Sequence, residues 1–261
     1  MKKLNSQINV NAVLCQEFFL NFNFYFSDIS TDEMTAQCVI FLLAGFDTTS
    51  SSLTMVAYLL AQNPEVQKRL YTEVVTMIEK LAEQQETEIE TKNIFTFFSY
   101  DAVNLKFPLL NAVIAETQRL YPPAIFIERT ASADVQLTTN EGTVLELKAG
   151  EVVHIPVWSL HRDPAYWGED AGEFKPERFL ENSSAALKNA AYLPFGAGSR
   201  MCIAQRMATV ELRLALLHLV RHFRFEVCPE KTEREVTFVN QFDINSPKAV
   251  HLRIVKRKCE N

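Results

Sequence analysis

The spacing of apolar residues predicts a chain built mainly from helices. Residues 34–61 are rich in Leu, Phe, Ala and Val, and Ser30 with Glu33 three positions later forms a capping box ahead of them. Asn63 and Pro64 carry the cap and first-turn signals of a helix start. We therefore expect one long helix to end near residue 62 and a second to begin directly after it.

Two more helices are predicted later in the chain. Residues 108–120 open on Pro108 and stop before Pro122, and proline is typical of both boundaries. A long amphipathic helix is expected after Cys202. Its predicted apolar stripe comprises Ile203, Met207, Val210, Leu214 and Leu217.

Short alternating runs between and after these helices predict strands. The runs lie at 125–127, 135–137, 144–147, 152–155, 223–227 and 250–254. The predicted fold class is therefore mainly α with small antiparallel β-sheets. Residues 1–29 show no clean period, so we expect an N-terminal extension of unclear structure followed by one domain over residues 30–258.

Composition and charge exclude several kinds of binding partner and structural site. The 261 residues have a net charge of −6. Nucleic-acid-binding proteins usually carry an excess of basic residues, so we expect no nucleic-acid partner. The five cysteines are odd in number and form no CxxC pair, which favours an intracellular protein over a disulfide framework or a zinc site. The chain has no unbroken run of about 18 apolar residues, so we expect no transmembrane segment in it.

One stretch, residues 195–204, carries the most specific chemistry. Gly196 and Gly198 permit a tight loop and a close approach of the backbone to a flat group. Cys202 follows where the next helix begins, and the free N–H groups there favour a thiolate. Arg200 adds a cation two residues away. A thiolate is a known axial ligand of haem iron.

A second unusual stretch, residues 44–50, lies inside the first long helix. It combines a glycine with an acid and three hydroxyl residues, which is locally unfavourable in a helix. Such a break in local consistency indicates function. The structural alternative is a notch of small residues in which a threonine bonds back to the preceding turn.

These two stretches together resemble the cytochrome P-450, or haem-thiolate monooxygenase, family. Residues 195–204 match its haem-binding signature except at Ala204, where the family usually has Gly. Residues 44–49 match its oxygen-activating helix motif. The sequences at residues 161–164 and 176–179 are most similar to those of the animal microsomal clan, which contains drug and steroid hydroxylases and thromboxane synthase. The fold implied is the C-terminal portion of the cytochrome P-450 fold.

The resemblance implies a role for each matched residue. Cys202 would ligate the iron of haem b. The cofactor-binding residues would be Cys202, Arg200, Arg129, Phe195 and Ala44. Thr48 and Asp47 would be catalytic, a hydroxyl and an acid that deliver protons to dioxygen. The alternative for Arg129 is a solvated charge at a sheet edge.

The resemblance also implies a structural network and a substrate wall. Glu116 and Arg119 match the family's Glu-x-x-Arg pair, and Arg178 is its expected third partner; the alternative is a surface ion pair. The substrate-lining candidates are Ala124, Ile125 and Phe126, with a turn at 241–245 as a further lining loop. His161 has no partner at metal-ligand spacing and is expected to form structural hydrogen bonds.

The resemblance predicts a monooxygenase that oxidises a small lipophilic substrate with O2 and electrons from an NADPH-cytochrome reductase. Full-length relatives would associate with the endoplasmic reticulum membrane. The chain is about half the usual family length, so we expect the membrane anchor and most of the substrate pocket to lie outside it. The alternative is a non-catalytic fragment or truncated isoform that keeps the scaffold without productive haem binding. A helical interaction protein is the third hypothesis.

Overall fold

The computed structural model describes residues 29–84, 102–103, 106–138, 142–181, 190–241 and 244–257. The chain divides into two compact units, Met1–Phe46 and Asp47–Asn261. The predicted extension, residues 1–29, lies outside the described residues except for its last residue. Helix α2, Thr31–Gln62, belongs to both units.

The described part of the first unit is the beginning of α2. The Ser30 backbone N–H donates to Glu33 Oε2 at 2.8 Å, and the Glu33 N–H donates to Ser30 Oγ at 3.3 Å. The predicted capping box is therefore confirmed. The helix continues without interruption through the glycine and hydroxyl stretch to Gln62.

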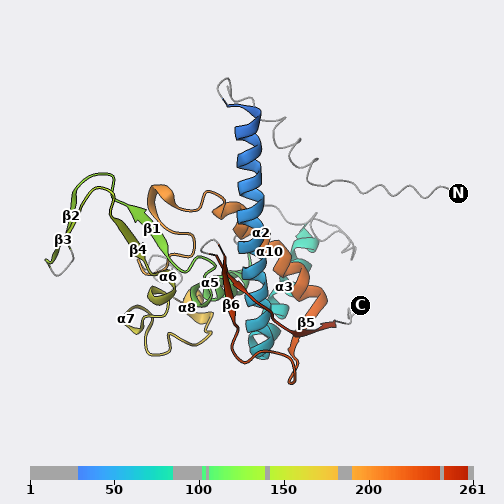
Figure 1. The fold of residues 1–261 in the computed structure, drawn as a ribbon. Helices are drawn as coiled ribbons and strands as arrows, with labels where there is room; N and C mark the ends of the chain where they lie inside the picture. The colour runs from blue at the N-terminus through green and yellow to red at the C-terminus, as the bar shows by residue number, and fades with distance from the viewer. Residues whose placement is uncertain are drawn as a thin grey trace. The chain divides into compact units, whose positions relative to one another are not determined.

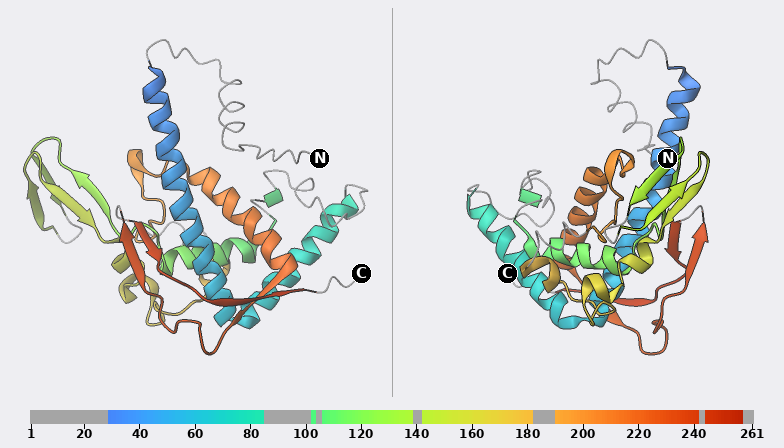
Figure 2. Two further views of the ribbon diagram at one scale, coloured as in Figure 1. Left: turned by 45° about the vertical axis from the view of Figure 1, so that its right-hand side comes forward. Right: turned by 90° about the vertical axis from the view of Figure 1, so that its left-hand side faces the viewer.

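The second unit is built on three further long helices. These are α3, Pro64–Gln84; α5, Pro108–Leu120; and α10, Gln205–His222. They pack against one another and against the end of α2, as Figures 1 and 2 show. Leu60, Leu70, Leu110 and Leu216 are among the fully buried residues of this core. Asn63 separates α2 from α3 as predicted: its carbonyl accepts the Gln67 N–H at 3.1 Å, and its side-chain amide donates to the Leu59 carbonyl at 2.8 Å and so caps the end of α2.

The strands form small antiparallel pairs. Their bounds are β1, Ile127–Thr130; β2, Val135–Thr138; β3, Val144–Leu147; β4, Val152–Ile155; β5, Phe223–Val227; β6, Phe238–Gln241; β7, Ile244–Pro247; and β8, Leu252–Lys256. The pairs within the described residues are β1 with β4, β2 with β3, β5 with β8 and β6 with β7. The predicted fold class, mainly α with small antiparallel sheets, is confirmed.

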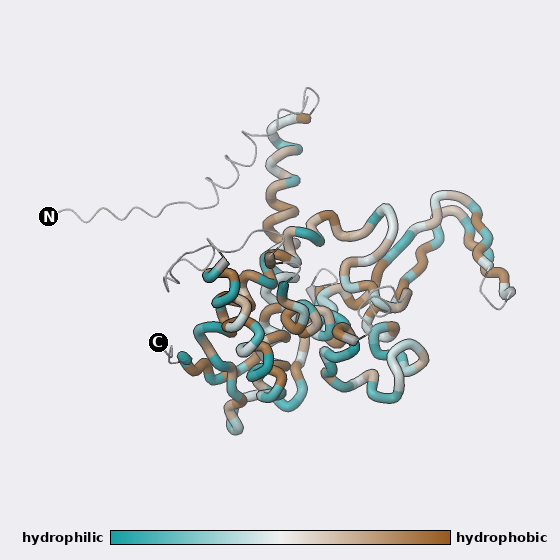
Figure 3. The backbone as a smooth tube through the Cα atoms, turned by 180° about the vertical axis from the view of Figure 1, so that it is seen from behind, coloured by the Kyte–Doolittle hydropathy of each residue, from teal (hydrophilic) through white to brown (hydrophobic). Residues whose placement is uncertain are grey.

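Short helices connect these elements. They are α6, Val157–Leu160; α7, Pro164–Trp167; α8, Glu177–Glu181; and a 3₁₀ turn, Gly198–Arg200. The β2–β3 hairpin extends away from the helices (Figure 1), and its register places Val135 and Leu137 opposite Leu147 and Leu145 on one face. In Figure 3 the hairpin carries hydrophobic colour interrupted by hydrophilic residues.

The start of α10 differs from the sequence prediction. The helix begins at Gln205, and the predicted stripe residues Ile203 and Met207 are 85% and 70% exposed. Leu217 is buried as predicted, because the C-terminal part of the helix packs into the core. Only that part of α10 has its apolar face covered by the described residues.

Helix α2 is long and apolar enough, by length and composition, to cross a membrane. The sequence predicts no membrane-spanning segment because the chain has no unbroken apolar run. Helix α2 contains hydroxyl and acidic residues, yet its mean hydropathy is high enough to pass the test. A core helix of a globular protein passes the same test. Met55, Leu59 and Leu60 are buried, so the C-terminal part of α2 is a core helix of the second unit.

Candidate functional site

Cys202 lies at the end of a closed loop. The Cys202 backbone N–H donates to the Phe195 carbonyl at 2.9 Å, which joins the two ends of the predicted glycine loop. Gly196 and Gly198 have φ angles of 74° and 77°, in the region that favours glycine. The sequence folds this way because only residues without a Cβ make both reversals without strain.

The surroundings of Cys202 are exposed and largely apolar. The cysteine itself is exposed, and its sequence neighbours Met201 and Ile203 and the α10 residue Met207 are 45%, 85% and 70% exposed. Arg200, two residues before it, is also exposed. No group of three or more potential metal ligands occurs among the described residues. A single thiol beside apolar side chains and a cation suits a flat, apolar, anionic metallocofactor better than a bare ion.

Glu116 and Arg119 form a fully buried ion pair on α5. Arg119 Nε and Nη2 donate to the two Glu116 carboxylate oxygens at 2.7 and 2.8 Å, and both side chains have no exposed surface. Arg178 Nε lies 3.4 Å from Glu116 Oε1. The structure thus brings the three predicted network residues together, with a carboxylate between two guanidinium groups.

The network also fixes loops to α5. Arg119 Nη1 donates to the carbonyls of His161 and Ala171, both at 2.7 Å. Arg178 Nη1 donates to the Trp167 carbonyl at 2.8 Å. These three bonds therefore hold the backbone of the segment that leads toward the Cys202 loop.

His161 connects this network to the Cys202 loop. Its Nε2 accepts the Leu193 N–H at 2.8 Å, so the ring proton is on Nδ1, which donates to the Arg119 carbonyl at 3.1 Å. The Leu193 carbonyl in turn accepts the Gly196 N–H at 3.1 Å. Burial, together with the charges of Arg119 and Arg162, lowers the pKa of His161 to about 4.

The expectation that His161 forms structural hydrogen bonds is confirmed. Its position between α5 and the loop was not predicted, because the contacts join segments distant in sequence. Tyr192 was missed altogether. Its hydroxyl donates to the Ala115 carbonyl at 3.2 Å and its ring stacks on His161 at 5.5 Å. An aromatic residue just before the Pro-Phe-Gly sequence was the one available signal.

The hydroxyl stretch of α2 has its side chains bonded largely to the helix itself. Ser52 Oγ donates to the Thr48 carbonyl at 2.9 Å, and Ser50 Oγ donates to the Asp47 carbonyl at 3.2 Å. The Asp47 side chain is exposed and Thr48 is half-buried. Ser51 Oγ bonds Ser246 Oγ on β7 at 3.0 Å. Ala44 belongs to the first unit, whereas Thr48 belongs to the second.

The predicted substrate-lining segments lie side by side. Ala124 forms a β-bridge with Ile244, and the Asn245 N–H donates to the Pro123 carbonyl at 2.7 Å. The turn at 241–245, whose residues 242 and 243 lie outside the described part, is therefore adjacent to the segment after the prolines.

The neighbouring predicted residues have local partners. The Phe126 ring stacks on His154 with centroids 5.0 Å apart, and the Ile125 carbonyl accepts the Trp158 N–H at 3.0 Å. Arg129, half-buried on β1, donates to the Glu128 carbonyl at 2.8 Å.

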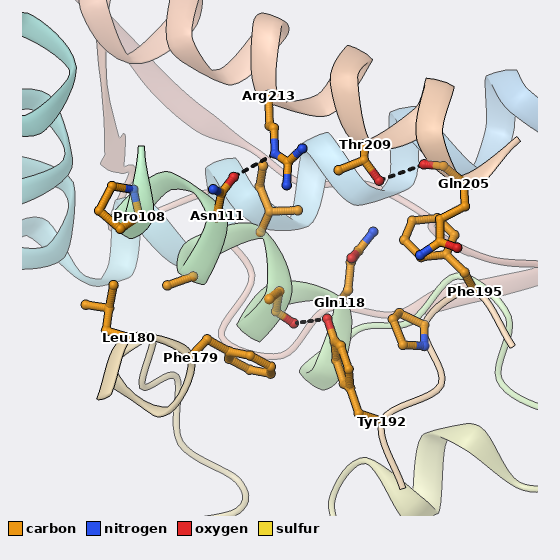
Figure 4. A pocket seen from close by; sticks show the side chains of 14 residues that line it. Pro108, Asn111, Gln118, Phe179, Leu180, Tyr192, Phe195, Gln205, Thr209 and Arg213 are labelled. Carbon is orange, nitrogen blue, oxygen red and sulfur yellow. Dashed lines mark hydrogen bonds between the residues drawn. The ribbon is translucent and has the colours of Figure 1, made fainter. Parts of the chain in front are cut away.

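A pocket of about 470 Å³ lies between α5, α8 and α10 (Figure 4). Arg213 donates to Asn111 Oδ1 at 2.6 Å on one side, and Tyr192 lies on the other. Phe195 lines this pocket, whereas the other predicted haem contacts do not. The pocket therefore does not by itself gather the predicted cofactor-binding residues.

Comparison with known proteins gives a consistent assignment. The family model described as Cytochrome P450 matches residues 11–252. Cytochrome P450 3A9 of Rattus norvegicus is 36% identical over 229 residues, covering 88% of this chain and 41% of that protein. Thromboxane-A synthase of Sus scrofa is 33% identical over 229 residues, covering 88% of this chain and 39% of that protein.

A third relative agrees with these two. Cytochrome P450 9e2 of Blattella germanica is 38% identical over 196 residues, covering 75% of this chain and 34% of that protein. The chain therefore spans about two fifths of the length of the curated relatives it matches. Because the family model matches far more than half of the chain, the chain belongs to the cytochrome P450 family.

Proposed function

We propose that this chain provides the haem-binding, oxygen-activating part of a haem-thiolate monooxygenase. The observation that carries the proposal is the exposed thiol of Cys202, held on a loop closed by the Cys202 N–H to Phe195 carbonyl bond. Haem b, when bound, supplies an iron that binds and activates dioxygen. Exposed apolar side chains next to the thiol fit the face of such a group.

Five residues would hold the haem. Cys202 would ligate the iron, and Arg200 and Arg129 would pair with the propionates. Phe195 and Ala44 would contact the macrocycle. Two separate guanidinium groups suit two carboxylates, because arginine binds carboxylates in a bidentate geometry.

Thr48 and Asp47 would control protons. The Thr48 hydroxyl can donate a hydrogen bond to the dioxygen substrate, and the exposed Asp47 carboxylate can exchange protons with water. Both lie in the one helical stretch whose sequence is locally unfavourable for a helix, which supports a role beyond packing.

Glu116, Arg119 and Arg178 would act as positioning residues. Their hydrogen bonds hold the backbone at His161, Ala171 and Trp167. His161 in turn accepts a hydrogen bond from Leu193, just before the loop that carries Cys202, and so helps to fix the position of that loop. The network is fully buried at its centre, so its role is to fix the scaffold and it does not contact a substrate.

The substrate would be a small lipophilic molecule that contacts Ala124, Ile125 and Phe126. Electrons would come from an NADPH-cytochrome reductase, and the working protein would associate with the endoplasmic reticulum membrane. Relatives among mammalian cytochromes P450 3A and thromboxane-A synthase support these proposals by family membership.

The test is to express residues 1–261 with a haem precursor and to measure haem stoichiometry. NADPH-dependent oxidation of several lipophilic probes is then assayed with a reductase. Stoichiometric haem with product formation supports the proposal in full. Haem without product supports the cofactor assignment and the alternative of a non-catalytic fragment, whereas a soluble, folded chain that takes up no haem contradicts the proposal.

A further inference from the structure

Two histidines lie together near the C-terminal end of α10, the orange helix of Figure 1. His218 and His222 are four residues apart, so their side chains project from the same side of the helix. Their ring centroids are 4.4 Å apart, with the planes inclined by 36°. Both are half-buried, and neither belongs to the Cys202 loop or to the buried network.

This separation matches two imidazoles that share one metal ion. With a metal–nitrogen bond of about 2.1 Å, each ring centre lies roughly 3.2 Å from the metal, and two rings at a right angle are then roughly 4.5 Å apart. The observed 4.4 Å between the His218 and His222 ring centroids agrees with this separation.

The protonation of His222 also suits a metal. His222 Nδ1 lies 2.9 Å from the His218 carbonyl oxygen, and only an N–H can satisfy that acceptor. The proton is therefore on Nδ1, and the lone pair of His222 is on Nε2.

We propose that His218 and His222 form a surface site for a divalent late transition metal such as Cu²⁺, Ni²⁺ or Zn²⁺. Imidazole nitrogen suits these ions, whereas Mg²⁺ and Ca²⁺ prefer oxygen ligands. No group of three or more potential metal ligands occurs in the described part of the chain, so water completes the coordination. The site is independent of the proposed haem chemistry.

The experiment is a Zn²⁺ titration of the full chain by isothermal calorimetry at neutral pH. His218→Gln and His222→Gln should each weaken one zinc-binding event by about tenfold or more, since each removes a direct ligand. His251→Gln is the matched control, because that histidine is exposed and bonded to Glu233, and it should leave the titration unchanged. Wild-type zinc affinity and stoichiometry in both glutamine variants would overturn the proposal.

A second variant covers the case in which a histidine replacement unfolds the chain. Arg221 is a cation next to His218, so it should oppose binding of a second cation. Arg221→Gln, verified as folded by circular dichroism, should tighten zinc binding a few-fold. Unchanged or weaker affinity in that folded variant would place any bound zinc away from the histidine pair.

Discussion

Replacing Glu116 by Ala tests the buried network most sharply. The carboxylate accepts two bonds from Arg119 at 2.7 and 2.8 Å and the Lys175 N–H at 2.9 Å, and it lies 3.4 Å from Arg178 Nε. Arg119 has no exposed surface. The substitution therefore leaves a guanidinium charge buried without its carboxylate.

The expected loss of stability is about 3–5 kcal/mol, because breaking a buried pair leaves an uncompensated charge. A typical domain has only about 5–15 kcal/mol of unfolding free energy. Glu177→Ala is the matched control on the same protein. Glu177 pairs with Arg69 at 2.6 Å, but their side chains are 31% and 51% exposed, so that loss should be at most about 1 kcal/mol.

The assay is urea unfolding at neutral pH followed by circular dichroism, comparing midpoints and slopes for wild type, Glu116→Ala and Glu177→Ala. Glu116→Ala should lower the midpoint far more than Glu177→Ala, or should yield only aggregated protein. If both variants are soluble and lose the same small amount of unfolding free energy, the buried network does not stabilise the fold in the way its geometry indicates.

Three further changes have defined outcomes. Because the pKa of His161 is about 4 in the folded chain and 6.5 is its ordinary value, the unfolded chain binds the proton more readily, so about 3 kcal/mol of stability should disappear as pH falls from about 6.5 to 4. Urea unfolding across that range should show a shallower pH slope for His161→Gln, and equal slopes would refute this. Gly196→Ala forces a side chain into the left-handed region at φ 74° and should cost about 1–2 kcal/mol by the same assay, whereas the control Gly45→Ala, inside helix α2 where a Cβ meets nothing within 4 Å, should lose no stability because Ala favours a helix over Gly. Thr48→Ala should keep haem content while diverting NADPH electrons to peroxide, and full coupling of NADPH to product would argue against proton control by Thr48.

Local signals were sufficient for most helices and strands. The Ser30 capping box, the proline at position 108 and the alternation over 152–155 each act through neighbouring residues, and the structure agrees with all three. The start of α10 could not be predicted in the same way. Its apolar residues Ile203 and Met207 have the helical period, but the described chain covers only the later part of the helix.

The candidate site shows the same division between local and distant contacts. The two-glycine loop with Cys202 is contiguous, so its geometry follows from local sequence. The His161 connection joins Arg119 on α5 to Leu193 before the loop, residues that only the folded chain brings together. Periodicity contains no information about such pairs, and a lone histidine gave only the general expectation of hydrogen bonding.

Ligation of haem iron by Cys202 is tested most directly by the carbon monoxide difference spectrum of the reduced, haem-loaded chain. Wild type should give the thiolate-type Soret band, and Cys202→Ser should lose it. Cys228→Ser, at a half-buried cysteine whose N–H bonds Thr232 Oγ1, is the matched control and should keep the band. A thiolate-type band that persists in Cys202→Ser would contradict the assignment of this cysteine as the iron ligand.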